Sequence, residues 1–314
     1  MLTLEGSETE APALVAESEA MRQILELVDR VASSDCCVLI EGESGTGKEL
    51  VARRLHARSG RRDRPFIPVN CAGISEGVFE SQFFGHVRGA FTGAEQTMLG
   101  LVRTAEGGTL LLDEVGEVPL NQQAKLLRFL QDGEVMPVGG TGPVRADVRV
   151  VAATNRDLRA LVREGGFRED LFYRLNVVRV CLPPLRDRRE DVLPLLEHFV
   201  AAQARADGSE PIEVPAAVRR QLREYDWPGN VRELSSWVQR ARATGLPAHV
   251  LAASLAADGG GESRAGEAVT LAEAERRAIA VALDAAGDNR SEAARILDVH
   301  RGTLLRKMAQ YDMA

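Results

Sequence analysis

Cys37-Val-Leu-Ile-Glu-Gly42-Glu-Ser-Gly-Thr-Gly47-Lys48 is the stretch that decides the fold class of this 314-residue chain. A short apolar run leads into a glycine-rich loop, and a helical pattern begins at Glu49, which is the context of a phosphate-binding loop (P-loop). Glycines let backbone N–H groups turn toward phosphate oxygens, and Lys48 adds a positive charge. The simpler alternative is a glycine turn beside a surface lysine. The predicted ATP-binding residues are Gly42, Glu43, Ser44, Gly45, Thr46, Gly47, Lys48 and Glu49.

A second motif, Thr109-Leu-Leu-Leu-Asp113-Glu114, ends an apolar run with two carboxylates. At the carboxyl edge of a parallel sheet these acids would face the P-loop. Asp113 would hold Mg²⁺ directly or through water, and Glu114 would orient and deprotonate the attacking water. Two acids at a strand end are common in exposed turns. After a P-loop they predict hydrolysis of ATP.

Apolar runs at 37–40, 109–112 and 148–153 alternate with helical patterns, which predicts an α/β layer with a parallel sheet flanked by helices. From Pro183 helical spacing continues without strand runs, and a glycine-rich stretch at 258–266 indicates a flexible linker. The last segment reads as three helices. The predicted domains are an N-terminal tail (1–12), an α/β subdomain (13–182), a small α-helical subdomain (183–252), a linker (253–268) and a C-terminal all-α unit (269–314).

Composition excludes several classes of protein. No run approaches the roughly 18 to 20 apolar residues of a membrane span, and residues 1–10 are acidic, which predicts a cytoplasmic protein without membrane contact. The net charge of −7 argues against a chain that coats nucleic acid, although a local basic surface stays open. The four cysteines match no metal-ligand or disulfide spacing, and we expect all of them to be buried.

The hexapeptide Gly89-Ala90-Phe91-Thr92-Gly93-Ala94 carries no charge and one aromatic residue. Two glycines and two alanines do not make a core strand or a capped helix, so the segment reads as a loop tip that presents Phe91 and Thr92. An exposed phenylalanine there would indicate a partner surface. The alternative from composition is a buried turn whose Phe91 packs on neighbouring helices.

These motifs together resemble a known family. The hexapeptide is similar, letter for letter, to the motif by which bacterial enhancer-binding activators of the AAA+ class engage the sigma-54 factor of RNA polymerase. Those activators also carry an acidic residue at the position of Glu49, where other P-loops have Ser or Thr. The resemblance covers residues 13 to about 250 and 269 to 312. It implies an AAA+ ATPase core, an α-helical lid and a Fis-type helix-turn-helix.

The resemblance also implies a function. Such a protein is a sigma-54-dependent transcriptional activator that binds double-stranded enhancer DNA and uses ATP hydrolysis to turn the closed polymerase complex into an open one. Its subunits form a hexameric ring, with a dimer as the alternative resting form. In a two-state mechanism, the site before hydrolysis raises the hexapeptide loop to grip sigma-54, and phosphate release lets it fall. A second loop, at 135–145, has three glycines and two prolines and would lie beside it.

Residue roles at the nucleotide site follow from the same resemblance. Thr154 and Asn155 look like the polar sensor of the γ-phosphate, and Arg232 looks like the second sensor, on the phosphates. Asn70 matches the switch residue that pairs with the catalytic glutamate until sigma-54 is engaged. Taken alone, Thr154-Asn155 reads as an ordinary turn and Asn70 as a cap.

The segment Phe167–Leu175 looks like the arginine-finger segment of the family. Arg168 and Arg174 would then reach into the neighbouring subunit's site, which requires a ring. From the residues alone, such a run is more often a charged helix face.

The C-terminal unit reads as helix, tight turn, helix. Between Arg290 and Lys307 there are five Arg or Lys residues against two acids, a local basic excess in an acidic protein. These side chains would contact phosphates and bases in the major groove. The alternative is a packing or dimerising bundle with a basic face, which the helix-weakening Gly302 keeps open. The predicted DNA-contacting residues are Arg290, His300, Arg301, Thr303, Arg306 and Lys307.

Two rival functions come from other classes. One is a DNA-binding AAA+ regulator that acts without sigma-54, which should have a damaged hexapeptide or damaged acids at 113 and 114, whereas both are intact here. The other is a AAA+ machine that works on proteins or DNA junctions, which would need neither the hexapeptide nor the C-terminal unit. With only about 12 residues before the ATPase, we expect no control domain, so regulation would come from a protein in trans, from expression level, or not at all. The alternative is that the sequence is truncated.

Overall fold

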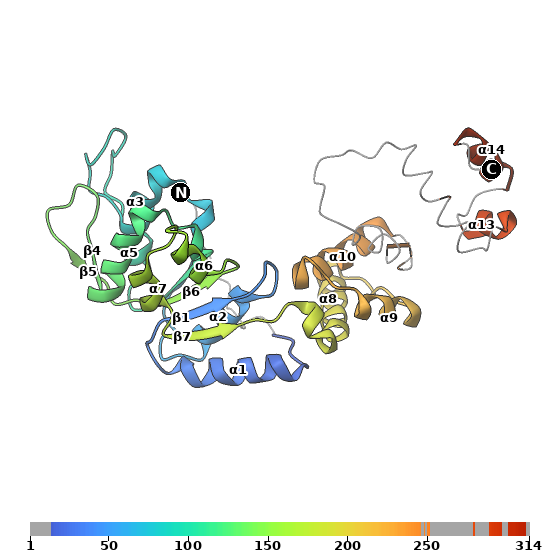
Figure 1. Cartoon of the computed structure of the whole chain (residues 1–314), viewed down its shortest axis with the longest axis horizontal. Coiled ribbons are helices and arrows are strands. Elements are labelled where there is room, and N and C mark those ends of the chain that lie inside the picture. The colour runs from blue at the N-terminus through green and yellow to red at the C-terminus, as the bar shows by residue number, and fades with distance from the viewer. Residues whose placement is uncertain are drawn as a thin grey trace. The chain divides into compact units, whose positions relative to one another are not determined.

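The computed structural model describes residues 14–245, 248, 250, 251, 279, 289–296 and 301–311. The chain divides into two compact units, one up to residue 259 and one from residue 260 (Figure 1). The predicted tail (1–12) and linker (253–268) lie outside the described residues, so those two assignments stay predictions.

A five-stranded sheet forms the centre of the first unit, and all its strand pairs are parallel. This confirms the predicted α/β class. The carboxyl ends of neighbouring strands meet at one edge, where Asn70 pairs with Asp113 and Glu41 with Thr154. The strand order is β2 (Phe66–Asn70), β3 (Thr109–Asp113), β6 (Arg149–Thr154), β1 (Val38–Glu41) and β7 (Val178–Cys181).

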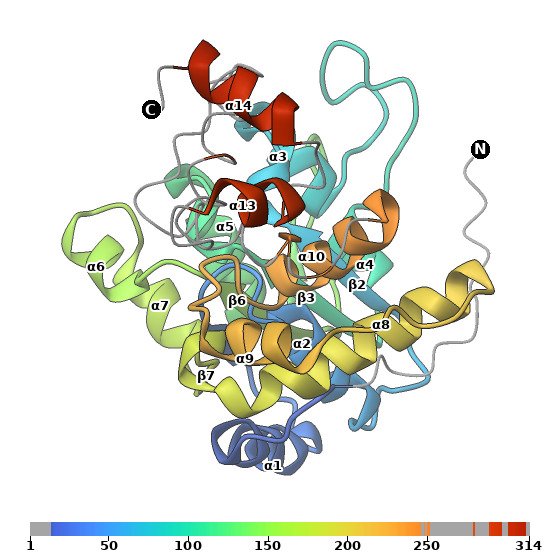
Figure 2. The same ribbon diagram turned by 90° about the vertical axis from the view of Figure 1, so that its right-hand side faces the viewer.

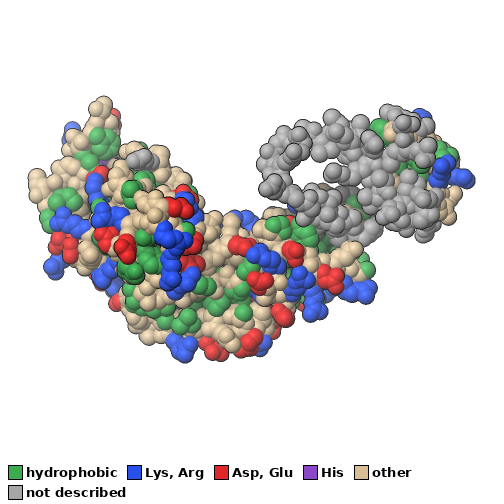
Figure 3. All heavy atoms as spheres, in the orientation of Figure 1, with side chains coloured by type: hydrophobic (Ala, Val, Ile, Leu, Met, Phe, Trp, Pro, Cys, Tyr) green, Lys and Arg blue, Asp and Glu red, His purple; other side chains and the backbone are tan. Residues whose placement is uncertain are grey.

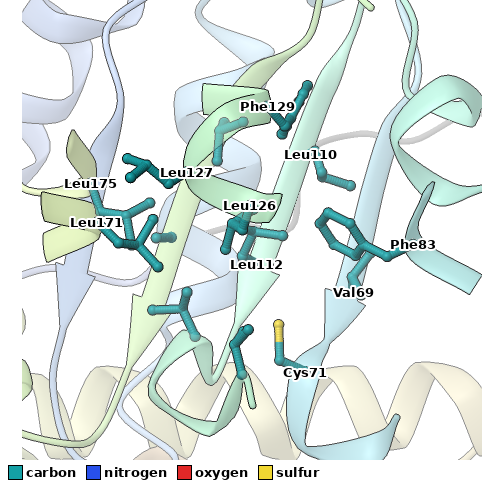
Figure 4. Close-up of a cluster of buried hydrophobic side chains, with 14 of the residues drawn as sticks. Val69, Cys71, Phe83, Leu110, Leu112, Leu126, Leu127, Phe129, Leu171 and Leu175 are labelled. Carbon is teal, nitrogen blue, oxygen red and sulfur yellow. The ribbon is translucent and has the colours of Figure 1, made fainter. Parts of the chain in front are cut away.

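Both faces of the sheet are covered by helices, because successive strand residues point to opposite faces and both sets are apolar. On one face Leu110 and Leu112 of β3 belong to one buried apolar cluster, to which five helices contribute: α3 (Glu76–Phe84), α4 (Leu101–Thr104), α5 (Leu120–Asp132), α6 (Leu158–Arg163) and α7 (Glu169–Leu175). Figure 4 shows Leu126 and Leu127 of α5 lying over these strands. On the other face Leu111 packs with α1 (Glu19–Ala32) and α2 (Lys48–Ala57).

Helix α1 is fixed at both ends by polar side chains. At its start the Ser18 hydroxyl accepts a hydrogen bond from the Met21 N–H. At its end the buried Arg149 guanidinium donates to the carbonyls of Ala32 (2.6 Å) and Val31 (3.0 Å), which have no partner within the helix. The two caps therefore hold α1 against the sheet.

The lid consists of helices and short 3₁₀ turns with a core of its own, as expected for the segment after Pro183. Trp227 and Trp237 are fully buried in that core, and the Trp227 indole N–H donates to the Leu222 carbonyl. Figure 2 shows α8, α9 and α10 gathered together. The elements are η3 (Leu185–Asp187), η4 (Arg189–Asp191), α8 (Val192–Asp207), α9 (Ala216–Glu224) and α10 (Asn230–Thr244).

The second unit contains two described helices, α13 (Arg290–Ile296) and α14 (Arg301–Gln310). Ala294 and Leu304 are buried against each other's helices, together with Met308. The turn between them and most of the predicted first helix lie outside the described residues.

Two general expectations can be compared with the structure. Within the described parts of the chain, no helix combines the length and the apolar character needed to cross a lipid bilayer. The expectation that all four cysteines are buried is wrong, because only Cys71 is buried and Cys181 is exposed. Cys181 ends edge strand β7, where its side chain points away from the core and lies beside Glu41.

Candidate nucleotide site and partner-contact loop

The predicted P-loop joins β1 to α2, as the sequence order requires. Gly45 and Gly47 have φ values of 80° and 102°, a backbone region that side chains disfavour. A Cβ at Gly45 would also lie 2.4 Å from the Gly229 carbonyl of the lid. Glycine is therefore required at position 45 both by conformation and by the close approach of the lid.

Lys48 and Glu114 face each other across the candidate site. The Lys48 side chain is 7% exposed, its ammonium donates to the Gly42 carbonyl (2.9 Å), and it lies 3.8 Å from the Glu114 carboxylate. The second Glu114 oxygen accepts a hydrogen bond from the Asn155 N–H at 3.2 Å. The structure thus brings together the lysine, the predicted base and one predicted sensor residue.

Glu114 has a left-handed backbone, with φ 52° and ψ 49°. For a residue other than glycine this conformation costs about 1–2 kcal/mol. Strained residues of this kind cluster at functional sites, where the surrounding fold holds them in place. The strain agrees with a role for this side chain in the reaction.

Asp113 is the carboxylate predicted to hold Mg²⁺, directly or through water. Among the described residues, no three His, Cys, Asp or Glu side chains gather as a complete metal site. Mg²⁺ is usually held by one or two carboxylates together with the phosphates of a nucleotide, so this donor set fits it. One Asp113 oxygen accepts from the Glu114 N–H at 3.1 Å.

The predicted sensor residue Thr154 and the predicted switch residue Asn70 lie at the same sheet edge. The Thr154 carbonyl accepts from the Gly42 N–H, and its hydroxyl accepts from the Arg156 N–H. The Asn70 amide oxygen accepts from the Ala72 N–H at 3.0 Å and caps a short 3₁₀ turn. In this state Asn70 acts as the cap that its sequence position alone suggested, and its switch role stays a prediction.

A cavity of about 540 Å³ lies between the P-loop and the lid. Its volume is in the range of pockets that hold cofactors. Lid residues that the sequence did not reveal contribute to its wall, because their positions become adjacent to the P-loop only in the fold. The lining residues include Lys48, Asp113, Glu114, Phe199, Arg232, Ser235, Ser236 and Gln239.

Arg232 belongs to this site through the lid helix α10. Its guanidinium donates to the Ser44 hydroxyl at 2.9 Å, and the N–H groups of Val231 and Arg232 donate to the Gly45 carbonyl. The arginine therefore lies beside the phosphate-binding loop, as the sequence predicts, although its contact with phosphates stays a prediction.

Two lid residues missed by the sequence hold Glu43 of the P-loop. Arg186 makes a bidentate ion pair with the Glu43 carboxylate at 2.5 and 2.9 Å, and the buried Asn230 amide donates to the same carboxylate and to the Ser44 carbonyl. The hydrogen bond from Arg186 lowers the pKa of Glu43. The Glu43 carboxylate thus pairs with the lid, and the prediction that Glu43 contacts the nucleotide stays a prediction.

The two candidate arginine fingers lie away from the nucleotide cavity of their own chain. The Arg168 guanidinium, 43% exposed, pairs with Asp170 at 2.7 Å. Arg174 donates to the Leu130 carbonyl and borders a separate cavity of about 380 Å³ lined also by Cys37. Neither arginine is among the residues that line the cavity beside the P-loop.

The hexapeptide forms an exposed loop tip between α3 and α4. Phe91 is 46% exposed and Thr92 is also exposed, whereas Ala94 is buried. The Gly89 N–H donates to the Ala94 carbonyl at 2.9 Å, which closes the loop, and positive φ values at Gly89 and Gly93 make the turn. The Phe91 ring lies 5.0 Å from the His86 ring, centroid to centroid. The alternative of a buried Phe91 is therefore not observed.

The second predicted loop lies beside the first. It connects β4 (Glu134–Val135) to β5 (Val144–Arg145), and its Val138 N–H donates to the Gly85 carbonyl while its carbonyl accepts from the Val87 N–H. A Cβ at Gly139 would lie 2.8 Å from the Ala90 side chain. The two loops are thus joined at their bases.

Most of the predicted DNA-contacting residues lie on the two described helices of the second unit. Arg290 is exposed at the start of α13, and Arg301 and Arg306 are exposed on α14. Thr303 and Lys307 are half-buried on α14, and His300 lies outside the described residues. Figure 3 shows basic and acidic side chains interspersed over the visible face of the first unit.

Family models match three successive segments of the chain. Residues 14–181 match the sigma-54 interaction domain, residues 186–267 the AAA+ ATPase lid domain, and residues 270–311 the bacterial regulatory proteins of the Fis family. Fold and site therefore define a AAA+ ATPase joined to a DNA-binding module.

Individual proteins agree with these matches. The transcriptional regulatory protein FlbD of Caulobacter vibrioides is 44% identical over 96% of this chain and 70% of its own length. The regulator NtrC of Bradyrhizobium is 49% identical over 80% of this chain and 52% of its own length. The crystal structure of NtrX from Brucella abortus in complex with ADP has a TM-score of 0.73 at 34% identity, covering 96% of this chain and 70% of NtrX. The chain belongs to the sigma-54-dependent transcriptional regulators.

Proposed function

We propose that the cavity beside the P-loop binds ATP with Mg²⁺ and that its hydrolysis drives the hexapeptide loop against sigma-54. The observation that carries the proposal is the convergence of Lys48, Glu114 and Asn155 at one edge of the sheet, on the chain that exposes Phe91. The C-terminal unit brings the protein to enhancer DNA. The site of action is then the bacterial cytoplasm, where promoter and polymerase are.

Each residue of the site has a distinct part in this reaction. Lys48 neutralises charge on the phosphates. Asp113 would hold Mg²⁺ directly or through water, and the ion would screen the phosphate charge. Glu114 orients a water molecule and takes its proton. Its second oxygen accepts a hydrogen bond from the Asn155 N–H. A movement of Glu114 on loss of the γ-phosphate would therefore act directly on the end of β6.

The arginine fingers require more than one subunit. Arg168 and Arg174 do not line their own chain's cavity, and Arg168 is exposed. Both facts favour action on a neighbouring subunit, and we propose a hexameric ring, with a dimer as resting form. A regulatory protein acting in trans is the proposed source of control.

The experiment that tests the function compares Phe91→Ala with the unaltered protein in open-complex formation by purified sigma-54 polymerase. We expect ATP turnover within about twofold of the original and loss of open complexes, because Phe91 lies outside the nucleotide cavity. Val78→Ala, another exposed apolar position, is the control. Unchanged open-complex formation in Phe91→Ala would refute the proposed action of the hexapeptide loop on sigma-54. Absence of open complexes with the unaltered protein would favour the rival function, a AAA+ regulator independent of sigma-54.

A further inference from the structure

Residues 14–18, here called the N-terminal strap, contact both halves of the ATPase unit. Val15 packs on the apolar core of the lid, whereas Leu14 and Ala16 pack on the cluster formed by α1, α2 and the sheet. Ser18 ends the strap and caps α1. Five consecutive residues therefore connect the lid to the sheet without taking part in the nucleotide cavity.

The strap is held by a carboxylate of the lid. Asp191 is fully buried at the end of η4, and its side chain accepts three hydrogen bonds from the strap: from the Glu17 N–H (2.7 Å), the Ser18 N–H (2.7 Å) and the Ser18 hydroxyl (2.8 Å). Hydrogen bonds to a carboxylate are shorter and stronger than those between neutral groups. The strap thus determines where this carboxylate lies.

Asp191 belongs to the same turn as a buried arginine. Arg188 is 2% exposed, and its carbonyl accepts from the Asp191 N–H at 3.0 Å. Burial lowers the pKa of Arg188, and the negative charge of Asp191 opposes that shift. Its guanidinium donates to the Thr46 carbonyl of the P-loop at 2.7 Å, while its Nε has no hydrogen-bond partner among the described residues.

The Thr46 carbonyl controls a donor of the nucleotide site. In a planar trans peptide the Thr46 carbonyl and the Gly47 N–H point in opposite directions. When Arg188 holds the carbonyl, the Gly47 N–H is directed to the other side, and Gly47 itself lines the cavity. No atom lies within 4 Å of a Cβ placed on Gly47, so side-chain packing does little to hold this peptide.

We propose that the strap, Asp191 and Arg188 form a positioning network that presets the Thr46–Gly47 peptide for phosphate, so that the strap sets the nucleotide affinity of the site. Arg188 and Ser18 are positioning residues, and neither lines the cavity. The proposal rests on the nucleotide binding proposed above and names a route by which the start of the ATPase unit reaches it. A structural event at residues 14–18 would then change ATP binding without any contact with ATP.

The test is a double-mutant cycle on nucleotide affinity in the full chain. Binding of a fluorescent ATP analogue is titrated for the original protein, Ser18→Ala, Arg188→Met and the double variant, with thermal midpoints measured alongside. Ser33→Ala is the matched control, because its hydroxyl donates to the Arg30 carbonyl at the exposed far end of α1. We expect Kd to rise about threefold for Ser18→Ala and about tenfold for Arg188→Met.

The double variant decides whether the residues act together. We expect its Kd to match that of Arg188→Met, since Ser18 acts through Arg188. Additive losses would overturn the network, and so would lowered thermal midpoints with unchanged Kd, which assign a structural role only. If Arg188→Met does not fold, Ser18→Ala against Ser33→Ala decides alone, and equal Kd values overturn the proposal. Failure of the original protein to bind the analogue would instead refute the proposed function.

Discussion

The Lys48 ammonium lies 3.8 Å from the Glu114 carboxylate, so the proposed phosphate-binding group and the proposed base of the reaction face each other at one edge of the sheet. For Glu114→Gln we expect ATP turnover to fall by at least about a hundredfold, because the amide does not accept the proton of the attacking water. Nucleotide affinity should be kept or increased, since a negative charge beside the phosphates is removed. ATP turnover is measured by phosphate release, and nucleotide affinity is measured as the Kd from a titration. A Kd raised tenfold would show that Glu114 chiefly shapes the site.

Arg168 pairs with Asp170 within its own chain and lies outside its own cavity, which allows a test of action between subunits. Arg168→Ala and Lys48→Ala should each be inactive as ATPases. Mixed together, they should regain activity, because one subunit supplies an intact cavity and the other an intact arginine. Arg62→Ala mixed with Lys48→Ala is the control for the effect of mixing. No gain over Arg168→Ala alone would place the arginine's action within one chain.

His56 should make the fold sensitive to mild acid. Its side chain is buried, its Nδ1 lies 3.0 Å from the Thr109 hydroxyl, and burial lowers its pKa below the usual 6.5. Below about pH 6.5 the unfolded chain takes up a proton that the folded chain takes up only at lower pH, so stability falls as pH falls.

Urea unfolding at pH 7.5 and 5.5 measures this effect. We expect His56→Gln to be less stable at pH 7.5, because the ring is lost, yet to lose less stability between the two values than the original protein. His198→Gln in α8 is the matched control. An equal loss in all three proteins would remove His56 as the cause.

The basic residues of α14 should contribute to DNA affinity in a salt-dependent way. Arg306 is exposed on this helix, and replacing it with Ala should weaken binding to enhancer DNA and reduce the slope of log affinity against log salt by about 1. Arg205→Ala, the same change at an exposed position of α8, is the control. Unaltered affinity and slope would support the alternative of a packing bundle. Fluorescence anisotropy at several salt concentrations provides the data.

The parts of the site that follow one another in the sequence were predictable. The strand, the glycine loop and Lys48 are neighbours in the sequence, so the motif itself determines how they lie relative to one another. Asp113 and Glu114 come at the end of a buried apolar strand, which places them at the edge of the sheet. The parallel sheet then brings the two motifs to one edge. The exposure of Phe91 was not predictable from composition, which left a buried turn as the alternative; the resemblance to the family motif favoured the exposed loop tip that the structure has.

Contacts across long stretches of sequence were not predictable. Three polar side chains of the lid contact the P-loop only because of the fold, and nothing in the sequence distinguishes them from other polar residues. They are Arg186, Arg188 and Asn230. Glu43 was predicted as a nucleotide ligand on its position in the motif. Its carboxylate accepts hydrogen bonds from Arg186 and Asn230 of the lid, which the sequence did not reveal, and its role as a nucleotide ligand stays a prediction.

At Glu114 the left-handed backbone lowers the stability of the fold, while the side chain that it carries is the proposed base of the reaction. Glycine there would relieve the conformational strain and remove a carboxylate held beside Asp113, so the variant should fold as well or better while hydrolysing nothing. Selection for thermal tolerance alone would therefore favour an inactive enzyme at this residue. A glutamate in this conformation thus exchanges fold stability for the proposed reaction.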